Sequence, residues 1–324
     1  MRTGAYQKIH NNAALKKIIF ILGFLVFRLF FVSPQNLYCE ETGFKYLKNY
    51  SYKDHYEHQA QNWGITQAKN GFIYVANNGG VLEFDGVSWR VIYVPNYTVR
   101  SLAIDESGTI YIGGKDEIGY LAPDAKGSLQ YVSLLKYLDD NQKNFSNVWR
   151  THATKEGIYF RTSTFLFRWN SGEIKVWKTD HLFRASFVCK GNFFVQQQKK
   201  GLMQLVNDSF KLIPGGETFA EEKIWMMVPY DNDKHSQKLL IGTRSKGFFL
   251  YDGKTAAPFP IEAADYLKEN ILYHGIRLSS GDFALATLHG GLVIMDSHGD
   301  LKYTLDKNSG LQDENIKYVF QDIQ

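Results

Sequence analysis

The sequence predicts an all-β protein, a β-propeller of six complete four-stranded blades and an incomplete seventh. Three observations lead to this prediction. Short runs rich in β-branched and aromatic residues alternate with turns rich in Gly, Asn and Asp over residues 63–324. These runs recur in groups of four. Successive groups begin roughly 40 residues apart, which is the repeat length of propeller blades.

The stretch from Val99 to Tyr120 shows the repeated unit most clearly. It contains three short runs, 99–105, 109–114 and 118–121, separated by turn or loop residues at 106–108 and 115–117. Runs of this length and composition, bounded by turn residues, are typical of antiparallel strands in a meander.

Six complete units are predicted in order along the chain. The first has strands 63–68, 72–76, 80–84 and 89–94, and the second has strands 99–105, 109–114, 118–121 and 129–134. The third has strands 148–154, 158–161, 165–169 and 174–177, and the fourth has strands 183–189, 193–196, 201–206 and 210–213. The fifth has strands 224–230, 238–242, 247–251 and 257–261, and the sixth has strands 273–278, 282–286, 291–295 and 301–305. One such sheet cannot bury its own apolar faces, so the units are expected to pack side by side around an axis.

Both ends of the repeat carry additional strand-like runs. Residues 316–323 repeat the opening strand of a blade, with no second or third strand after them. Residues 44–50 form a further run, and we interpret 40–62 as a lead-in that contains a closing strand. We therefore expect the chain to be the front part of a longer protein, or a truncated reading frame.

Residues 1–39 are interpreted as a signal peptide or an N-terminal anchor. Lys8, Lys16 and Lys17 precede an apolar run over 18–32 that is broken only by Arg28. The run is shorter than the roughly 20 residues of a membrane-spanning helix, which favours a signal peptide. We expect an exported protein, either periplasmic or attached to the membrane through this segment or a later region and facing the periplasm.

Composition and charge exclude several classes of protein. With 44% hydrophobic and 15% aromatic residues the chain can bury a core, and 37 basic against 33 acidic residues give no case for a nucleic-acid partner. The two cysteines, Cys39 and Cys189, exclude a disulfide framework and a thiolate metal site. Cys189 lies in an apolar run and is expected to be buried and inert.

Several segments resemble the two-component regulator propeller repeat: 71–89, 108–114, the junction 309–316 with Asp322, and the lead-in residues 52–56 and 61–63. The resemblance implies an extracytoplasmic sensing module of a bacterial signalling receptor. In such receptors a further β domain, a membrane helix and a cytoplasmic output region follow the propeller, and the full-length receptor is expected to be a homodimer. Residues 161–164 and 197–200 depart from the family pattern because they replace its glycine-bearing loop.

One face of the predicted ring collects the loops after each second strand and the connections between blades, so it is the expected ligand face. First strands are expected to be innermost and to begin on this face, which places cations and aromatic rings around a channel mouth. The predicted binding residues are Trp63, Asn77, Asn78, Arg100, Trp149, Arg150, Arg184, Trp225, Arg244, His274 and His289. This combination suits a saccharide or a small anionic ligand, through ring stacking and charge-assisted hydrogen bonds. The alternative is an ordinary polar channel lining, with the tryptophans packed between blades.

No motif indicates catalysis. The sequence has no Gly-x-Ser-x-Gly, His-Glu-x-x-His or phosphate-binding glycine loop. Residues 231–235 lack the glycine and glutamate of a calcium loop, which favours a solvated turn. We therefore expect no cofactor or metal and a non-catalytic sensing or binding module. The alternatives are a propeller-type polysaccharide lyase or glycoside hydrolase, and a protein-interaction platform.

Overall fold

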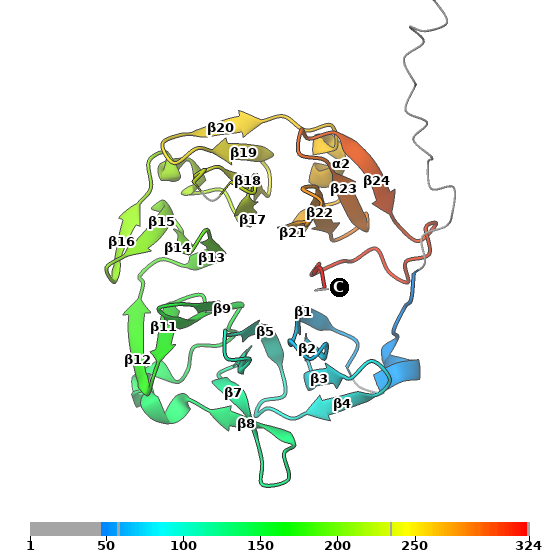
Figure 1. Ribbon diagram of the computed structural model, residues 1–324. Coiled ribbons are helices and arrows are strands. Elements are labelled where there is room, and N and C mark those ends of the chain that lie inside the picture. The colour runs from blue at the N-terminus through cyan, green and yellow to red at the C-terminus, as the bar shows by residue number, and fades with distance from the viewer. Residues whose placement is uncertain (1–46, 57–58, 234, 323–324) are drawn as a thin grey trace, which may run out of the picture. The chain divides into compact units, whose positions relative to one another are not determined.

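The computed structural model describes residues 47–56, 59–233 and 235–322. In this part of the chain the strands form six antiparallel sheets of four strands, each in chain order. The sheets are arranged as blades around a centre, with the first strand of each blade innermost and the fourth at the rim (Figure 1). The predicted all-β propeller with four-stranded blades is confirmed.

Blades 1 to 3 have the following bounds. Blade 1 consists of β1 Asn62–Gln67, β2 Ile73–Asn77, β3 Gly80–Phe84 and β4 Trp89–Ile92. Blade 2 consists of β5 Val99–Ile104, β6 Ile110–Gly114, β7 Ile118–Pro123 and β8 Leu129–Ser133. Blade 3 consists of β9 Arg150–Thr154, β10 Gly157–Arg161, β11 Phe165–Asn170 and β12 Glu173–Lys178.

Blades 4 to 6 repeat the same order. Blade 4 consists of β13 Phe183–Cys189, β14 Asn192–Gln197, β15 Gly201–Val206 and β16 Ser209–Leu212. Blade 5 consists of β17 Ile224–Pro229, β18 Leu239–Thr243, β19 Phe248–Tyr251 and β20 Ala256–Phe259. Blade 6 consists of β21 Leu272–Arg277, β22 Phe283–Thr287, β23 Leu292–Met295 and β24 Leu301–Leu305.

Short helices occupy the lead-in and the connections between blades. They are the π-helix η1 Tyr52–Tyr56, the 3-10 helices η2 Leu135–Tyr137, η3 Asp140–Gln142 and η4 Gly216–Phe219, and the α-helix α2 Ala264–Glu269. Among the described residues, no helix has the length and apolar character needed to span a membrane.

Apolar side chains hold neighbouring blades together. Five buried clusters lie at the five junctions between consecutive blades. The junction between blades 2 and 3, for example, buries Ile118, Val148 and Phe167, each fully enclosed. Gly113 of β6 allows this approach, because a Cβ atom there would lie 2.7 Å from Oγ1 of Thr151 in blade 3. Packing between blades therefore supplies the core that one sheet lacks.

Two irregular segments lie at the junction between blades 6 and 1. The amide of Asn49 donates to the carbonyl of Gly310 at 3.0 Å, which joins the lead-in to the residues after β24. The ring of Tyr50 packs edge-on against Phe84 of β3, with 5.3 Å between ring centres. In Figure 1 the C-terminal residues enter the space between β21 and β1.

The predicted strands at the two ends are not formed in the described residues. Residues 47–50 and 306–322 have no strand conformation, so the opening strand of a seventh blade is absent there. The physical reason is that 316–322 has no neighbouring strand among the described residues with which to form a hydrogen-bond ladder. Ile316 nevertheless donates its N–H to the carbonyl of Thr287 at 2.8 Å, as Val148 does to Gly114 where blade 3 begins. The predicted signal peptide or anchor, 1–39, lies outside the described residues. So do parts of the two predicted end strands, 44–46 and 323.

Cys189 is buried as predicted, with 2% of its surface exposed. Its thiol donates to the carbonyl of Met227 in the next blade at 3.3 Å. Burial raises the pKa of Cys189 to about 12. The thiol is therefore protonated and unreactive at neutral pH, because thiolates are the reactive form.

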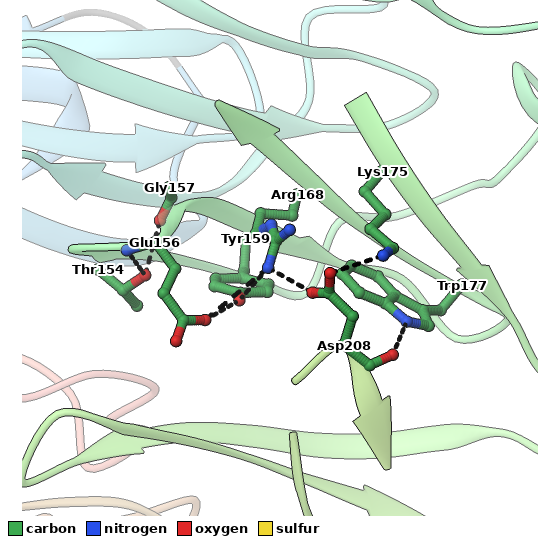
Figure 2. A network of polar contacts seen from close by, with 8 residues as sticks. All are labelled: Thr154, Glu156, Gly157, Tyr159, Arg168, Lys175, Trp177 and Asp208. Carbon is green, nitrogen blue, oxygen red and sulfur yellow. Dashed lines mark hydrogen bonds and ion pairs between the residues drawn. The ribbon is translucent and has the colours of Figure 1, made fainter. Parts of the chain in front are cut away.

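A polar network joins blades 3 and 4 near the rim (Figure 2). Both carboxylate oxygens of Asp208, in the turn between β15 and β16, accept hydrogen bonds from blade 3: Nη1 of Arg168 donates to Oδ1, and Nζ of Lys175 donates to Oδ2, each at 2.6 Å. The indole of Trp177 donates to the backbone carbonyl of the same residue at 3.0 Å. Asp208 therefore adds a polar link near the rim between two sheets that also share a buried apolar cluster.

Replacing Asp208 with asparagine is expected to lower the free energy of unfolding by about 1 kcal/mol, because two charge-assisted hydrogen bonds are lost at a site one-third exposed to solvent. The measurement is urea unfolding at pH 7. Asp300→Asn, in the exposed turn before β24, is the matched control and should have little effect. Equal losses for the two variants would contradict the role assigned to the network.

The difference in unfolding free energy between the wild type and Asp208→Asn should become smaller in acid. The hydrogen bond from Lys175 is the main cause that lowers the pKa of Asp208 in the folded protein. Folding therefore favours the ionised carboxylate, and its stabilisation is complete above the unfolded-state pKa of about 4 and is lost as the pH falls through the lowered folded-state pKa.

Candidate functional site

The innermost strands carry a repeated irregularity at one end. In five blades the ladder between the first and second strands shifts register at the second residue of the first strand. The residues at these bulges are Trp63, Arg100, Arg184, Trp225 and Tyr273. A bulge redirects a side chain from its regular alternation. In blade 3 Trp149 occupies the matching place just before β9, with its N–H bonded to the carbonyl of Arg161 at 2.9 Å.

These side chains line a central cavity with two connected parts. The outer part, of about 300 Å³, is called here the mouth chamber, and its walls include Trp149, Arg161, Arg184, Lys223, Trp225 and Tyr273. The deeper part, of about 190 Å³, is called the inner chamber, and its walls include Trp63, Ser101, Thr151, His152, His274 and Tyr318. Arg150, Ser186 and Trp225 line both chambers and connect them.

The mouth chamber is positively charged. Among the described residues, its walls contain Arg150, Arg161, Arg184 and Lys223 and no Asp or Glu. Arg161 is only 6% exposed, and burial lowers its pKa from the usual value. Burial, followed by the nearby Arg161, Arg244, Arg150 and Arg184, lowers the pKa of Lys223 to about 8. Each cation therefore destabilises the others, and a bound anion would relieve that repulsion.

The nearest carboxylates leave much of this charge uncompensated. Glu221 lies 4.0 Å from Nη2 of Arg184, with most of its own side chain in solvent. Glu222 is buried, but its carboxylate accepts hydrogen bonds from the backbone N–H and the hydroxyl of Ser245. Neither carboxylate forms an ion pair with Arg161 or Lys223 in the described residues.

Aromatic rings stand between the cations. The guanidinium of Arg100 lies 4.0 Å from the ring centre of Trp63 and 5.5 Å from that of Trp149. The ammonium of Lys223 lies 3.7 Å from the ring centre of Trp225. Trp225 also packs against Tyr273, with 4.6 Å between ring centres. These rings hold the cations by cation-π attraction, and Nε of Arg100 also donates to Oδ1 of Asn147 at 3.0 Å.

Unpartnered donors concentrate at the same place. Four buried side-chain nitrogens in the described part of the chain have no hydrogen-bond partner. Three of them belong to residues that line the cavity: Nη1 of Arg100, Nε of Arg161 and Nε1 of Trp225. Leaving a buried donor unpaired costs about 1 to 3 kcal/mol. A ligand acceptor that reached these groups after a small side-chain movement would recover that cost.

The inner chamber is polar but uncharged apart from the Arg residues at its outer end. Nε2 of His152 lies 2.9 Å from the hydroxyl of Ser186, and the hydroxyls of Ser101 and Thr151 lie 2.8 Å apart. Burial lowers the pKa of His152 to about 3 and that of His274 well below its usual value. Both imidazoles are therefore neutral at pH 7.

The C-terminal segment completes the wall between blades 6 and 1. The ammonium of Lys317 lies 5.5 Å from the ring centre of Trp63 and 5.7 Å from that of Tyr273. Tyr318 stacks on His274 with 4.1 Å between ring centres, and the N–H of Val319 donates to Nδ1 of His274 at 3.3 Å. Lys317 and Tyr318 thus place a cation and an aromatic ring between blades 6 and 1, as the first strands do elsewhere around the cavity.

Seven of the eleven predicted binding residues meet at the two chambers: Trp63, Arg100, Trp149, Arg150, Arg184, Trp225 and His274. Four line neither chamber. Asn77 is fully buried and donates to the carbonyl of Gln59, and Asn78 accepts the indole N–H of Trp63 at 2.8 Å. Arg244 and His289 are exposed on the loops after β18 and β22. Asn78 therefore positions a wall residue, and Arg244 acts on the site only through its charge.

Sequence reasoning missed Arg161, Lys223, Tyr273, His152 and Tyr318. Arg161 ends β10 and pairs with Arg150 across the ladder. The signal for it was the replacement of a glycine-bearing loop at 161–164, which places a large cation where other blades have a small or neutral residue.

Comparison with known proteins identifies the fold. No family model matches the chain, and no curated protein matches it. Among solved structures, the chain is similar to the extracellular domain of a hybrid two-component system from B. thetaiotaomicron, with a TM-score of 0.61 and 16% identity. The match covers 81% of this chain and 35% of the solved chain, so this chain spans about a third of that length.

Other propellers match over more of their own length. Virginiamycin B lyase from Staphylococcus aureus matches with a TM-score of 0.54 and 12% identity, over 75% of this chain and 84% of the lyase. The WD40 β-propeller domain of Doa1 matches with a TM-score of 0.55 and 14% identity, over 75% of this chain and 82% of that domain. Since an extracellular domain of a two-component system, a lyase and a WD40 domain share the fold, these similarities establish the architecture alone.

Proposed function

We propose that the chain is the exported sensing propeller of a bacterial signalling receptor of the two-component regulator propeller type, and that it binds an anionic small molecule at the channel mouth without converting it. The observation that carries the proposal is the mouth chamber, where Arg150, Arg161, Arg184 and Lys223 line a cavity whose described walls hold no carboxylate. The fold similarity to an extracellular two-component domain supports the sensing role. Residues 1–39 would direct export.

The chemistry of the chamber accounts for selectivity toward anions. Guanidinium groups offer paired donors that match the oxygens of carboxylate, sulfate or phosphate, and such charge-assisted hydrogen bonds are stronger than neutral ones. A partly enclosed, cation-lined cavity also concentrates field lines and attracts anions from solution. Trp149, Trp225 and Tyr273 add flat surfaces on which a ring-bearing ligand stacks.

The first test is titration calorimetry with sodium sulfate, against sodium chloride at the same ionic strength. Sulfate should bind saturably, and Arg184→Gln should weaken it about fivefold, since one charge-assisted contact of about 1 kcal/mol is lost. Lys211→Gln on β16 removes a positive charge far from the chamber and should leave the affinity unchanged. Equal weakening by both substitutions would show a nonspecific charge effect and would contradict a site at the mouth.

The second part of the test concerns turnover. The protein is incubated with each anion that binds, and the mixture is analysed by mass spectrometry. We expect every ligand to be recovered unchanged. A product whose formation depends on the protein would overturn the non-catalytic assignment in favour of the lyase or hydrolase alternative.

A further inference from the structure

The two chambers of the cavity differ in chemistry, and this difference suits a ligand with one charged part and one uncharged polar part. The mouth chamber presents the cations Arg161, Arg184 and Lys223, so it favours a negatively charged group. The inner chamber presents hydroxyl groups and neutral imidazoles at a greater depth along the same strands. In the part of the chain that the structure describes, no Asp or Glu lines either chamber. Among its described lining residues the inner chamber has only Arg100 and Arg150 as charged side chains, and an inorganic anion bound in the mouth chamber would leave the hydroxyls and imidazoles unused.

The inner chamber has donors and acceptors suited to hydroxyl groups. Ser101, Thr151 and Ser186 each contribute a hydroxyl that both donates and accepts. Nδ1 of His274 accepts the N–H of Val319, which leaves the proton of the neutral ring on Nε2 as a donor. Since a neutral imidazole presents one donor and one acceptor, these groups match an uncharged polar body better than a second anion.

Aromatic rings line the inner chamber, and one of them also lines the mouth chamber. Trp225 lines both chambers, and Trp63 and Tyr318 form part of the inner walls. Flat aromatic faces next to hydrogen-bonding groups suit a ring with hydroxyls at its edge and C–H groups on its face. Arg150, which also lines both chambers, stands where the charged and neutral parts of such a ligand would join.

We propose that the ligand is a polyhydroxylated organic anion, with its ionised group in the mouth chamber and its hydroxyl-bearing body in the inner chamber. This inference rests on the proposed function, because it requires an anion to bind at the mouth. The ionised group is a carboxylate, as in a sugar acid, or a phosphate, as in a sugar phosphate. The two sources share one chemistry, and the experiment distinguishes them.

The test compares four probes by titration calorimetry at pH 7: sodium glucuronate, glucose 6-phosphate, glucose and inorganic phosphate. At least one of the two sugar anions should bind about tenfold more tightly than inorganic phosphate, which is the effect of one or two added hydrogen bonds. Glucose should bind at least about tenfold more weakly than that sugar anion, because it lacks the ionised group. The tighter of the two sugar anions identifies the source of the charge.

Two variants separate the chambers. His274→Phe keeps a flat ring against Tyr318 but removes both ring nitrogens, and it should weaken the sugar anion about tenfold while leaving inorganic phosphate unchanged. Lys223→Gln should weaken both. Thermal unfolding of each variant checks that the fold is kept, and Ser101→Ala replaces His274→Phe if that variant does not fold.

The outcomes are distinguishable. If inorganic phosphate binds and neither sugar anion binds more tightly, the two-part ligand is overturned and the anion site at the mouth stands. If glucose binds as tightly as the sugar anions, the inference is also overturned, since charge then contributes nothing. If no anion binds, the proposed function itself fails.

Discussion

Replacing Phe167 with alanine is expected to lower the free energy of unfolding by about 3 to 5 kcal/mol. Phe167 lies in β11 and is fully buried at the junction between blades 2 and 3. Its ring centre lies 5.5 Å from that of Phe165 and 5.1 Å from that of Phe145. The sheets on either side are held by their own ladders, so they cannot close the cavity that the ring would leave.

The measurement is urea unfolding monitored by circular dichroism and tryptophan fluorescence. Phe167→Leu keeps most of the volume and should cost about 1 kcal/mol, which gives a reading even if the alanine variant does not fold. Phe320→Ala is the control, because Phe320 is 38% exposed in the C-terminal segment. A loss below about 1 kcal/mol for Phe167→Ala would mean that blades 2 and 3 are not held by this core.

The fold was predictable because each of its parts is specified locally. Strands such as Val99–Ile104 and Ile110–Gly114 are bounded by residues whose own chemistry forms the turn: the carboxylate of Asp105 accepts the N–H of Thr109 at 2.9 Å. Turns of this kind repeat along the chain with similar spacing. Local turn signals and an approximate period are therefore enough to predict four-stranded blades.

The ends of the chain show where that reasoning stops. Residues 316–322 have the sequence of an opening strand and the first contact of one, through the N–H of Ile316. Composition can indicate that a segment suits a sheet, but a strand exists only beside a partner strand. The described residues provide none there, so a favourable sequence remains irregular in conformation.

The site was predictable to the extent that it follows the repeat. Trp63, Arg100 and Arg184 were found because they occupy equivalent positions in aligned units. The bulges that direct them into the cavity leave no mark in the sequence. Arg161 was missed because it ends a second strand, β10, and does not begin a first strand. It lines the mouth chamber from its place opposite Arg150. Asn77 lies outside the cavity walls, because its amide bonds to the carbonyl of Gln59 in the lead-in, to Asn62 and to the N–H of Gly79.

The affinity for sulfate is expected to fall about tenfold between pH 7 and pH 9. Sulfate keeps its charge over this range. Burial lowers the pKa of Arg161, but its delocalised guanidinium stays protonated, because arginine is effectively not deprotonated in proteins. Lys223, with a pKa of about 8 in the free protein, loses its proton within the range. A bound dianion beside the ammonium favours the charged form and raises its pKa, so binding takes up a proton above pH 8. Affinity is therefore constant well below pH 8 and weakens about tenfold per unit above it.

Calorimetry in two buffers of different ionisation enthalpy measures the proton directly. At pH 8.5 each bound sulfate should take up about three quarters of a proton, since about a quarter of the free lysine is already protonated there. Lys223→Gln should bind more weakly at pH 7, take up no proton and lose the pH dependence, whereas Lys211→Gln should keep all three wild-type properties. An unchanged slope in Lys223→Gln would assign the titration to another group and remove Lys223 from the site. A slope that disappears places this ammonium against the anion, because remote charges are screened beyond about 10 Å at ordinary salt.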